Sequence, residues 1–451
     1  MWRKGVFVSP FFRVYGRLDN LMDKEIFGKK LLILGGNPET SALVRYANNM
    51  GIKTIVTSAR HNDDAKKYAW KSFDIDGMDV AGVVALAKEE GVDGVLVGVA
   101  DILVPSYCKV CNALGLPCYA MQGIVDVFSY KDVFKATCER YGIHGIPEFY
   151  LDETMAQEDI ERIKFPVMVK PVDNGGGVGM SVCYGREELE GAVKKALTAS
   201  KKRRFIVEKY MQCDDMGMYY TFQDGVCTAS CIYDRYTTDE QPGLSRVCLG
   251  GTYPSKHIGE YFRRMHDNAC RMFRDIGIRD GVLMLSAFYE DGEFYVYDTG
   301  FRLQGEAPHL LINAVYGFDQ REMLIHFALT GSGKFNEGVP GDAYLNGKWA
   351  ATQWFLLKQG SIGKIEGLEG WERDPRVVAN VQRLFEGDNI PEEWVGNEKQ
   401  VLARLYFVCD SKEELAGALH EYGKKVKVFD TDGNNMVLGG FDIEKALGFK
   451  E

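Results

Sequence analysis

A lysine followed by a glycine-rich turn is the segment whose residue types best suit a chemical role. Lys170 ends an apolar run, and four glycines follow it within five positions: Gly175, Gly176, Gly177 and Gly179. Glycines let a backbone approach a ligand closely and turn its N–H groups toward an anion. Lys170 would add a point charge for phosphate. The pattern predicts a phosphate-binding hairpin, and a surface hairpin without a ligand is the alternative.

A second candidate lies where an apolar strand ends in charged and aromatic residues. The strand predicted over residues 205–207 leads into Glu208, Lys209, Tyr210 and Met211. Backbone groups at its end could read the edge of an adenine ring, and Glu208 could accept hydrogen bonds from ribose hydroxyls. The same pattern also fits an ordinary strand that ends in charged residues.

Two carboxylates and an arginine leave a third apolar strand together. Asp298 ends this strand, and Arg302 and Glu306 follow it. A carboxylate at a strand end suits Mg²⁺, and an arginine suits phosphate or oxyanion charge. A solvated strand end without a ligand is the alternative.

Composition excludes several classes of protein. The chain has 451 residues, a formal net charge of −10, 46% hydrophobic residues and 26% charged residues, which is typical of a globular chain and not of a disordered one. An acidic balance argues against a nucleic-acid binder, and no apolar run reaches the ~18 residues that span a membrane. The 11 cysteines are expected to be reduced thiols in the cytoplasm. The lone C-x-x-C of Cys108 and Cys111 is expected to serve helix packing, with metal or redox use as the alternative.

Residues 28–122 alternate apolar strands with amphipathic helices, after an expected N-terminal extension over residues 1–27. Such alternation with short turns predicts a parallel sheet with right-handed crossovers. The loop Gly35-Gly36-Asn37 follows the first strand and precedes a helix, which is the geometry of an anion site. The loop lacks the G-x-G-x-x-G spacing of a dinucleotide fingerprint. A nicotinamide-dependent oxidoreductase is therefore only a third hypothesis.

The rest of the chain is expected to divide at residue 330. Residues 123–330 begin with one helix over residues 126–141 and continue with hairpins across Asp-Gly turns, which is typical of an α+β region. Residues 331–451 are predicted to hold further strands and helices, including a helix over residues 375–386.

The order of these pieces along the chain resembles that of the ATP-grasp superfamily. The pieces are a helix with Lys131, a strand with Lys170, a glycine-rich hairpin, the Glu208-Lys209 strand end and a hairpin that ends in Asp298. The resemblance covers residues 30–445 and is closest to carboxylate–amine ligases like biotin carboxylase and carbamoyl-phosphate synthase. It implies an α/β and α+β chain with three domains. These are a Rossmann-like pre-ATP-grasp domain, a two-subdomain ATP-grasp domain with a lid over residues 146–208, and a smaller C-terminal domain.

The resemblance implies where ATP would bind. Lys131 and Lys170 would contact its phosphates under the glycine-rich lid, and Arg302 would stabilise the transferred phosphoryl group. Glu208 would meet the adenine amino group or the ribose, and the backbone of Lys209 to Met211 would read the adenine ring. In the superfamily the γ-phosphate moves to a carboxylate or bicarbonate, and a nucleophile then displaces phosphate from the acyl phosphate. Positioning and charge neutralisation, normally with Mg²⁺, carry most of that catalysis.

The metal ligands depart from the superfamily pattern. The strand-end glutamate is Asp298 here, and the glutamate twelve residues earlier is Ser286. The usual asparagine two residues after the strand-end acid is Gly300, and the acid expected on the strand before the Asp224-Gly225 turn is Met218. Asp298 and the Ser286 hydroxyl, together with ATP oxygens, could hold one Mg²⁺ ion, which readily keeps water ligands.

A local match to biotin carboxylase indicates a second catalytic residue. The stretch Arg302-Leu303-Gln304-Gly305-Glu306-Ala307-Pro308 resembles R-x-Q-x-E-x-P, in which the glutamate is the base for bicarbonate. Glu306 could play that part, replace a lost metal ligand, or be an acid at a helix N-terminus. The candidates for the substrate site are Gly35, Gly36, Asn37, Asp101 and Arg404.

The sequence thus predicts an ATP- and Mg²⁺-dependent ligase that joins a small-molecule carboxylate to an amine through an acyl phosphate. The alternative is an ATP-grasp protein that binds nucleotide at a degenerate metal site without catalysis. The chain is expected to be cytoplasmic, to bind neither nucleic acid nor membrane, and it could form a homodimer as relatives often do. The acid and the nucleophile are not identified by the sequence.

Overall fold

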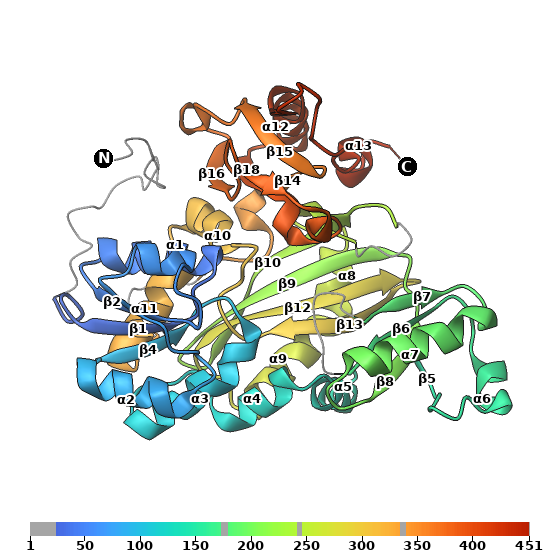
Figure 1. The fold of residues 1–451 in the computed structure, drawn as a ribbon, viewed down its shortest axis with the longest axis horizontal. Helices are drawn as coiled ribbons and strands as arrows, with labels where there is room; N and C mark the ends of the chain where they lie inside the picture. The colour runs from blue at the N-terminus through green and yellow to red at the C-terminus, as the bar shows by residue number, and fades with distance from the viewer. Residues whose placement is uncertain (1–23, 173–178, 241–245, 334–339, 451) are drawn as a thin grey trace.

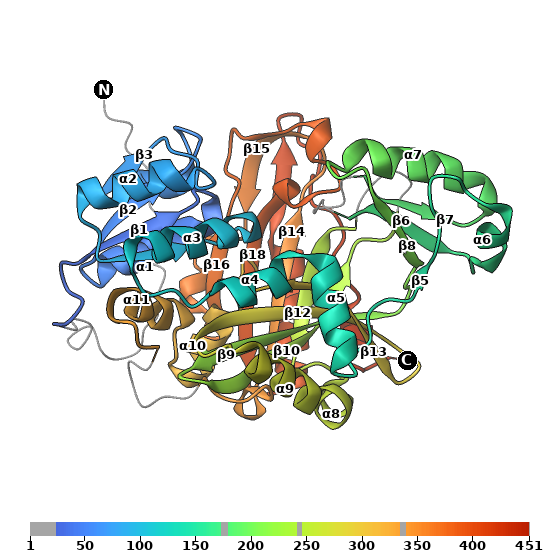
Figure 2. The same cartoon turned by 90° about the horizontal axis from the view of Figure 1, so that it is seen from below.

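The computed structural model describes residues 24–172, 179–240, 246–333 and 340–450. Two smaller sheets lie at opposite ends of the molecule, with a large twisted sheet between them (Figures 1 and 2). The glycines at positions 175 to 177 and nearly all of the expected N-terminal extension lie outside the described residues. Within those described ranges, no helix combines the length and the apolar character that crossing a bilayer requires.

The first sheet forms as the strand–helix alternation predicts. Its strands, in spatial order, are β3 (Lys71–Phe73), β2 (Lys53–Thr57), β1 (Lys30–Leu34) and β4 (Gly94–Val97), and all pair in parallel. The helices α1 (Pro38–Asn49) and α2 (Val80–Glu90) lie between these strands along the chain, and α3 (Val104–Leu114) follows β4. All four residues of β4 are buried, as expected of a parallel strand that is covered on both faces. Cys108 and Cys111 are buried in α3.

The second small sheet is antiparallel and lies in the segment expected to be a lid; we call it the lid sheet. Its strands, in spatial order, are β5 (Glu148–Phe149), β8 (Phe205–Lys209), β6 (Val167–Pro171) and β7 (Ser181–Cys183). The helices α6 (Gln157–Arg162) and α7 (Leu189–Ala199) pack with it in a hydrophobic cluster of their own. Because this cluster is separate from the main core, the lid sheet is a unit that can hold its own shape.

The helix expected over residues 126–141 is instead two helices. α4 (Gln122–Ser129) ends and α5 (Lys131–Arg140) begins at Tyr130, which is extended with φ −120° and ψ 115°. The prediction was wrong because the helical spacing of apolar residues continues across a single extended residue. The break makes Lys131 the first residue of α5.

The large sheet has eight strands. In spatial order they are β13 (Glu293–Gly300), β12 (Gly281–Glu290), β9 (Asp214–Gln223), β10 (Val226–Thr237), β11 (Cys248–Tyr253), β14 (Trp349–Leu356), β18 (Val401–Cys409) and β16 (Val377–Gln382). β11 pairs with β14, so the sheet continues across the boundary expected at residue 330. The helices of this part are α8 (Ile258–Tyr261), α9 (Asp267–Ile276), α10 (His309–Tyr316) and α11 (Gln320–Thr330), and α11 packs on α1 and β4 of the first part.

The helix predicted over residues 375–386 is wrong, because residues 377–382 form strand β16. It pairs antiparallel with β18 at the edge of the large sheet. Its three valines, at positions 377, 378 and 381, are β-branched and pack well on a pleated surface. Pairing with β18 thus overrides the helical spacing of the apolar residues.

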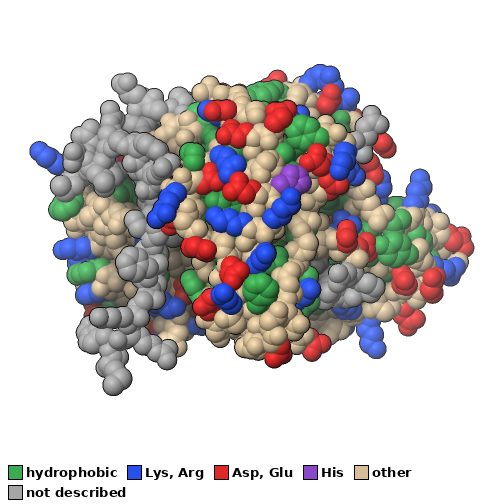
Figure 3. All heavy atoms as spheres, turned by 90° about the horizontal axis from the view of Figure 1, so that it is seen from above, with side chains coloured by type: hydrophobic (Ala, Val, Ile, Leu, Met, Phe, Trp, Pro, Cys, Tyr) green, Lys and Arg blue, Asp and Glu red, His purple; other side chains and the backbone are tan. Residues whose placement is uncertain are grey.

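A small third sheet completes the C-terminal part. Its strands, in spatial order, are β17 (Asn389–Ile390), β15 (Gly360–Glu366) and β19 (Lys427–Asp430), and the helices are α12 (Lys412–Lys425) and α13 (Ile443–Ala446). On the face shown in Figure 3, acidic and basic side chains are interspersed.

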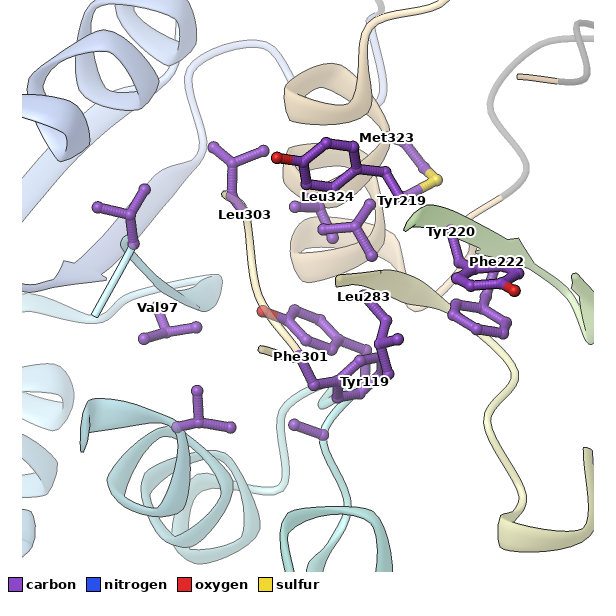
Figure 4. Close-up of a cluster of buried hydrophobic side chains, with 14 of the residues drawn as sticks. Val97, Tyr119, Tyr219, Tyr220, Phe222, Leu283, Phe301, Leu303, Met323 and Leu324 are labelled. Carbon is purple, nitrogen blue, oxygen red and sulfur yellow. The ribbon is translucent and has the colours of Figure 1, made fainter. Parts of the chain in front are cut away.

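Aromatic packing joins the first part to the large sheet. The ring centre of Tyr119 lies 5.3 Å from that of Phe301, which lies 6.3 Å from that of Phe222 on β9 (Figure 4). The ring centre of Phe327 lies 6.1 Å from that of Tyr119. Phe301 directly precedes Arg302, so this packing fixes where residues 302–306, which we call the polar loop, leave the sheet.

Candidate functional site

Helix α5 connects the lid sheet to the end of β13 through two lysines one turn apart. The charge of Lys131 acts on Asp298 at the end of β13. Lys135 lies 2.5 Å from the carboxylate of Glu148 and 3.7 Å from that of Glu208, both on the lid sheet. Residues four apart on a helix share a face, so one face of α5 links the lid sheet to the end of β13.

Lys170 and Glu208 form the inner wall of the lid sheet. The Lys170 ammonium lies 2.5 Å from a Glu208 carboxylate oxygen, and the two side chains are only 13% and 7% exposed. The pairing of β6 with β8 places these residues on one face. Glu208 is therefore held between Lys170 and Lys135, and its carboxylate is not directed outward as an unpaired acceptor.

The end of β8 uses most of its polar groups internally. The amides of Lys209 and Tyr210 donate to the carbonyls of Pro147 and Pro166, at 2.9 and 3.0 Å. The Lys209 ammonium pairs with Glu290 at the end of β12, which ties the lid sheet to the large sheet. Met211 is 3% exposed.

The glycine-rich turn can be followed only at its end, because residues 173–178 lie outside the described chain. Gly179 has φ +80°, and a Cβ there would lie 2.5 Å from the side chain of Ala199 on α7. This position therefore requires glycine on two grounds, its backbone conformation and its close packing.

Asp298 and Ser286 face each other directly on β13 and β12. Asp298 is solvent-exposed, yet the surrounding protein raises its pKa, while Lys131 and Arg302 lower it. The Asp298 carboxylate is therefore accessible to a ligand, although neighbouring protein atoms exclude part of the water around it. Ser286 is 2% exposed.

The side chains present fit a metal only weakly. Within the part of the chain that the structure describes, no three His, Cys, Asp or Glu side chains are grouped as metal ligands. One carboxylate and one hydroxyl remain at this point. That donor set suits a Mg²⁺ ion that takes its other ligands from phosphate and water.

A side chain at position 300 would collide with Asp101 of the first part of the chain. A Cβ at this position would lie 2.9 Å from a carboxylate oxygen of Asp101, and Asp101 forms an ion pair with Arg302. The Arg302 guanidinium also donates to the side-chain oxygen of Gln304 at 2.6 Å, while its Nε is buried without a partner among the described residues. The space that an asparagine would fill is therefore occupied by the Asp101–Arg302 pair.

Glu306 is held by three donors. The hydroxyls of Tyr219 and Tyr233 each donate to it at 2.6 Å, and the Arg235 guanidinium lies at 3.2 Å. Burial raises the pKa of Glu306, but Arg235 and the two hydroxyls more than offset this, so its pKa lies below its usual value. Its side chain is 20% exposed, so the ionised carboxylate remains accessible.

Asp215 and Arg235 are residues that the sequence reasoning missed. They lie directly opposite each other on β9 and β10, and the Tyr297 hydroxyl donates to Asp215 at 2.8 Å. Burial raises the pKa of Asp215 to about 6 despite the opposing charge of Arg235. A β-bulge between β12 and β13 accompanies this contact, and bulges commonly re-aim side chains near active sites.

The sequence held a signal for Asp215 in the alternation along β9. Asp215, Gly217 and Tyr219 share the polar face of the strand, whereas Met218 is fully buried on the other. The strand therefore does carry acids, Asp214 and Asp215, and Asp215 stands three residues before Met218. One row across the sheet carries Asp298, Ser286, Gly217 and Tyr233.

The expected substrate residues fall into two groups. Asp101 and Arg404 adjoin the polar loop, since Arg404 donates to the carbonyl of Gly305 at 2.7 Å and its guanidinium lies 3.9 Å from the ring centre of Trp354. Residues 35–37 instead make contacts within the first part of the chain. The Asn37 side chain caps α1 by accepting from the Thr40 amide, and a Cβ on Gly36 would lie 2.6 Å from Asp63.

A cavity of about 500 Å³ lies behind the polar loop, between α1, residues 303–310 and β16. Glu39 on α1 lies 3.5 Å from Arg383 and 3.8 Å from Arg404, so it bridges two arginines at this junction. All three parts of the chain meet here.

Comparison with known proteins gives one family match and several distant relatives. The family described as D-ala D-ala ligase C-terminus matches residues 147–230. The chain is 23% identical over 327 residues to the carbamoyl phosphate synthase large chain of Clostridium beijerinckii, covering 67% of this chain and 29% of that protein. It is 26% identical over 200 residues to the phosphoribosylamine–glycine ligase of Methanocorpusculum labreanum, covering 44% of this chain and 46% of that protein. The chain thus spans less than half the length of either relative.

Solved structures share the fold across most of the chain. An L-amino acid ligase from Bacillus licheniformis superposes with a TM-score of 0.72 at 19% identity, covering 90% of this chain and 99% of that one. The biotin carboxylase domain of the Hydrogenobacter thermophilus 2-oxoglutarate carboxylase superposes with a TM-score of 0.69 at 16% identity, covering 91% of each. That domain is a dimer in complex with MgADP, ADP and bicarbonate.

These likenesses agree with the order of motifs along the chain. Residues 147–230 match the C-terminal ATP-grasp family of D-ala D-ala ligases, and the chain as a whole shares the mixed α/β fold of ATP-grasp structures.

Proposed function

We propose that this protein is an ATP-dependent ligase that activates a carboxylate or bicarbonate as an acyl phosphate and transfers the acyl group to an amine. The observation that carries the proposal is the set of charged residues that α5 links. Lys170 and Glu208 form an ion pair on the lid sheet, Lys135 of α5 lies 3.7 Å from Glu208, and Lys131 of α5 acts on Asp298 at the end of β13. The biotin carboxylase domain that shares the fold binds MgADP, which supports ATP as the ligand of these residues.

In this proposal the lysines receive the triphosphate. Lys170 and Lys131 would provide positive charge for the phosphates, and Gly175, Gly176, Gly177 and Gly179 would offer backbone N–H groups to them. The backbone from Lys209 to Met211, beside Glu208, meets the adenine. Asp298 and Ser286 would hold one Mg²⁺ ion, which would neutralise charge on the phosphates.

The acid attacks the γ-phosphorus through a carboxylate oxygen, and ADP leaves. Arg302 forms an ion pair with Asp101 and would stabilise charge on the phosphoryl oxygens. The amine then attacks the acyl carbon, phosphate leaves, and the amine nitrogen must lose a proton. Catalysis of this kind depends mainly on position and charge.

Asp215 and Glu306 divide the acid–base work in this proposal. They share Arg235, yet the pKa of Asp215 is raised to about 6 while that of Glu306 is lowered. Two carboxylates whose pKa values are pushed apart suit different roles. Glu306 stays ionised and would orient the attacking group, or act as base toward bicarbonate, whereas Asp215 can carry a proton near neutral pH.

The acceptor would enter beside the polar loop. Asp101 pairs with Arg302, and Arg404 on β18 donates to the carbonyl of Gly305, so these two residues would line the acceptor site. Residues 35–37 of the first part would complete it. A homodimer belongs to the proposal because the related biotin carboxylase domain is a dimer.

A matrix assay tests the proposal. Phosphate release is measured with ATP, Mg²⁺ and pairwise mixtures of bicarbonate, amino acids and hydroxy acids with amines. We expect release that needs both an acid and an amine and that falls at least about 100-fold in Arg302→Met, since the guanidinium acts on the developing charge. The exposed Lys194→Ala variant is the control and should match the wild type. Tight ATP binding without release in any mixture would instead favour a nucleotide-binding protein without catalysis.

A further inference from the structure

Two cysteines from distant parts of the chain lie in contact beside the large sheet. Cys227 is near the start of β10 and Cys270 lies on α9, and their sulfur atoms are 3.6 Å apart. Both thiols are free and half-buried. Neither cysteine belongs to the ATP site proposed above.

A histidine completes this cluster. The His266 Nε2 lies 3.5 Å from the Cys270 sulfur. His266 ends a π-helical turn, η5 (Phe262–His266), which directly precedes α9; such turns are rare and often mark functional sites. The ring is fixed by packing against Phe262 and Tyr220, at centroid distances of 4.7 and 6.2 Å.

The surroundings divide the two thiols into a nucleophile and its partner. A hydrogen bond from the Cys227 thiol, with help from His266, lowers the pKa of Cys270, although burial and Asp267 oppose this. The pKa of Cys227 is raised by the same hydrogen bond and by burial. The thiolate is the reactive form of cysteine, so Cys270 is the first to react.

We propose that Cys227 and Cys270 are a peroxide-oxidisable dithiol that closes reversibly to a disulfide. The Cys270 thiolate attacks one oxygen of hydrogen peroxide, the O–O bond breaks, and hydroxide leaves, which gives Cys270 sulfenic acid. The Cys227 sulfur then attacks the Cys270 sulfur, and water leaves with the thiol proton and the sulfenic oxygen. The two sulfurs together lose two electrons, and the peroxide gains them.

The short separation makes closure compatible with the fold. A disulfide needs a sulfur–sulfur distance of about 2.05 Å, so the two side chains must approach by roughly 1.5 Å. The bond would tie α9 to β10, the strand that also carries Tyr233 and Arg235 of the Glu306 cluster. A cross-link between residues far apart in sequence removes freedom from the unfolded chain, so oxidation should raise Tm.

Neighbouring cysteines provide internal comparisons. Cys231, four residues further along β10, is fully buried, and burial raises its pKa above the usual range. Cys213 is half-buried, and burial raises its pKa to about 12. Cys118 is the main competitor, since a hydrogen bond with Cys111 lowers its pKa, but Cys111 is fully buried.

The test is oxidation of the full chain by hydrogen peroxide, followed by alkylation, trypsin digestion and mass spectrometry. We expect a mass loss of about 2 Da and a link between the peptides of residues 210–235 and 265–271, reversed by dithiothreitol. The link should vanish in Cys227→Ser and persist in Cys213→Ser, which removes a cysteine from the same peptide. His266→Gln should form it several-fold more slowly.

The wild-type digest alone decides the proposal if a variant fails to fold. A dithiothreitol-reversible link between Cys227 and Cys270 that forms before any other supports it. A first link between Cys111 and Cys118 would overturn it. So would irreversible oxidation of Cys270 without a link, or reaction of Cys270 no faster than that of Cys213.

Discussion

The three carboxylates of the site differ because their neighbours differ. Glu306 faces Arg235 and two tyrosine hydroxyls and keeps its charge, while Asp215 has less compensation for burial and holds a proton up to about pH 6. Asp298 is accessible, with Lys131 beside it. These differences arise from the contacts of each carboxylate, which the residue type alone does not predict.

Replacing Asp215 should change how stability depends on pH. Its folded pKa of about 6 lies above the usual 3.8, so the folded state binds the proton more tightly than the unfolded state. The free energy of unfolding of the wild type should therefore fall, relative to Asp215→Asn, as pH rises from about 4 to about 6, by at most about 3 kcal/mol. Urea denaturation of both proteins at several pH values measures this, and parallel pH curves would contradict it.

Ser286→Glu should strengthen the response to Mg²⁺. The new carboxylate would lie directly opposite Asp298, so the two charges repel without a cation and share one when it is present. We expect Mg²⁺ to raise Tm more in this variant than in the wild type, in the presence of a non-hydrolysable ATP analogue. Gly300→Asn is the informative comparison, because its side chain would meet Asp101 and should lower Tm without any gain from Mg²⁺. An equal Mg²⁺ shift in Ser286→Glu and the wild type would refute this reading of the strand pair.

Residue chemistry was only partly readable from the sequence. Lys170, Glu208 and Asp298 were singled out by a glycine-rich turn and by strand ends, which have local signatures, and Lys131 by the resemblance to the ATP-grasp order of motifs; their roles stay predictions. Asp215 escaped because its role depends on strand pairing, which sets Arg235 opposite it. Which residues face each other across strands is not a local property of the chain.

At the scale of elements, the site depends on how helices and strands present their faces. α5 begins at Lys131 because Tyr130 breaks the helix, and so its two lysines meet different sheets. β9 presents Asp215, Gly217 and Tyr219 on one face, where Gly217 leaves room for the ring of Tyr233.

Gly217→Ala tests the packing of β9 against β10. The added Cβ would overlap the Tyr233 ring, which must move and weaken its hydrogen bond to Glu306. We expect a loss of about 1–3 kcal/mol in the free energy of unfolding, as for other overpacked positions. Gly191→Ala is the matched control, since no atom lies near its Cβ on α7, and alanine should gain about 0.5–1 kcal/mol in a helix. Both are measured by urea denaturation; equal midpoints would show that Tyr233 is not confined.

Element prediction succeeded where spacing and pairing agreed. The parallel strands of the first sheet and the hairpins at Asp-Gly turns formed as expected. It failed at β16, whose apolar spacing suits a helix but whose valines pair with β18. It also failed at Tyr130, because one extended residue does not disturb an apolar pattern.

At the scale of the whole molecule, the large sheet is one unit from β13 to β16. The order of motifs indicated the parts of the fold, but not that β11 and β14 would pair across the expected boundary at residue 330. Pairing between strands about a hundred residues apart has no signature in local sequence.

A chain that ends at residue 345 tests this continuity. It would leave the edge of β11 and the apolar residues packed on it unpaired, and such edges promote aggregation. We expect this truncated chain to aggregate or to lose its cooperative unfolding transition, as judged by gel filtration and thermal melting. A soluble monomer with a sharp transition would show instead that the C-terminal part is an independent domain.

The central claim is that the residues linked by α5, from Lys170 and Glu208 on the lid sheet to Asp298 on β13, bind ATP. Isothermal titration calorimetry of ATP with Mg²⁺ tests it in the wild type, Lys170→Ala and the exposed-lysine control Lys194→Ala. A hydrogen bond to a charged group contributes about 1.5–3 kcal/mol to binding. Its loss in Lys170→Ala should therefore raise the Kd at least about tenfold, whereas the Kd of the control should not change. Equal affinity in all three proteins, or no heat of binding in the wild type, would contradict the account.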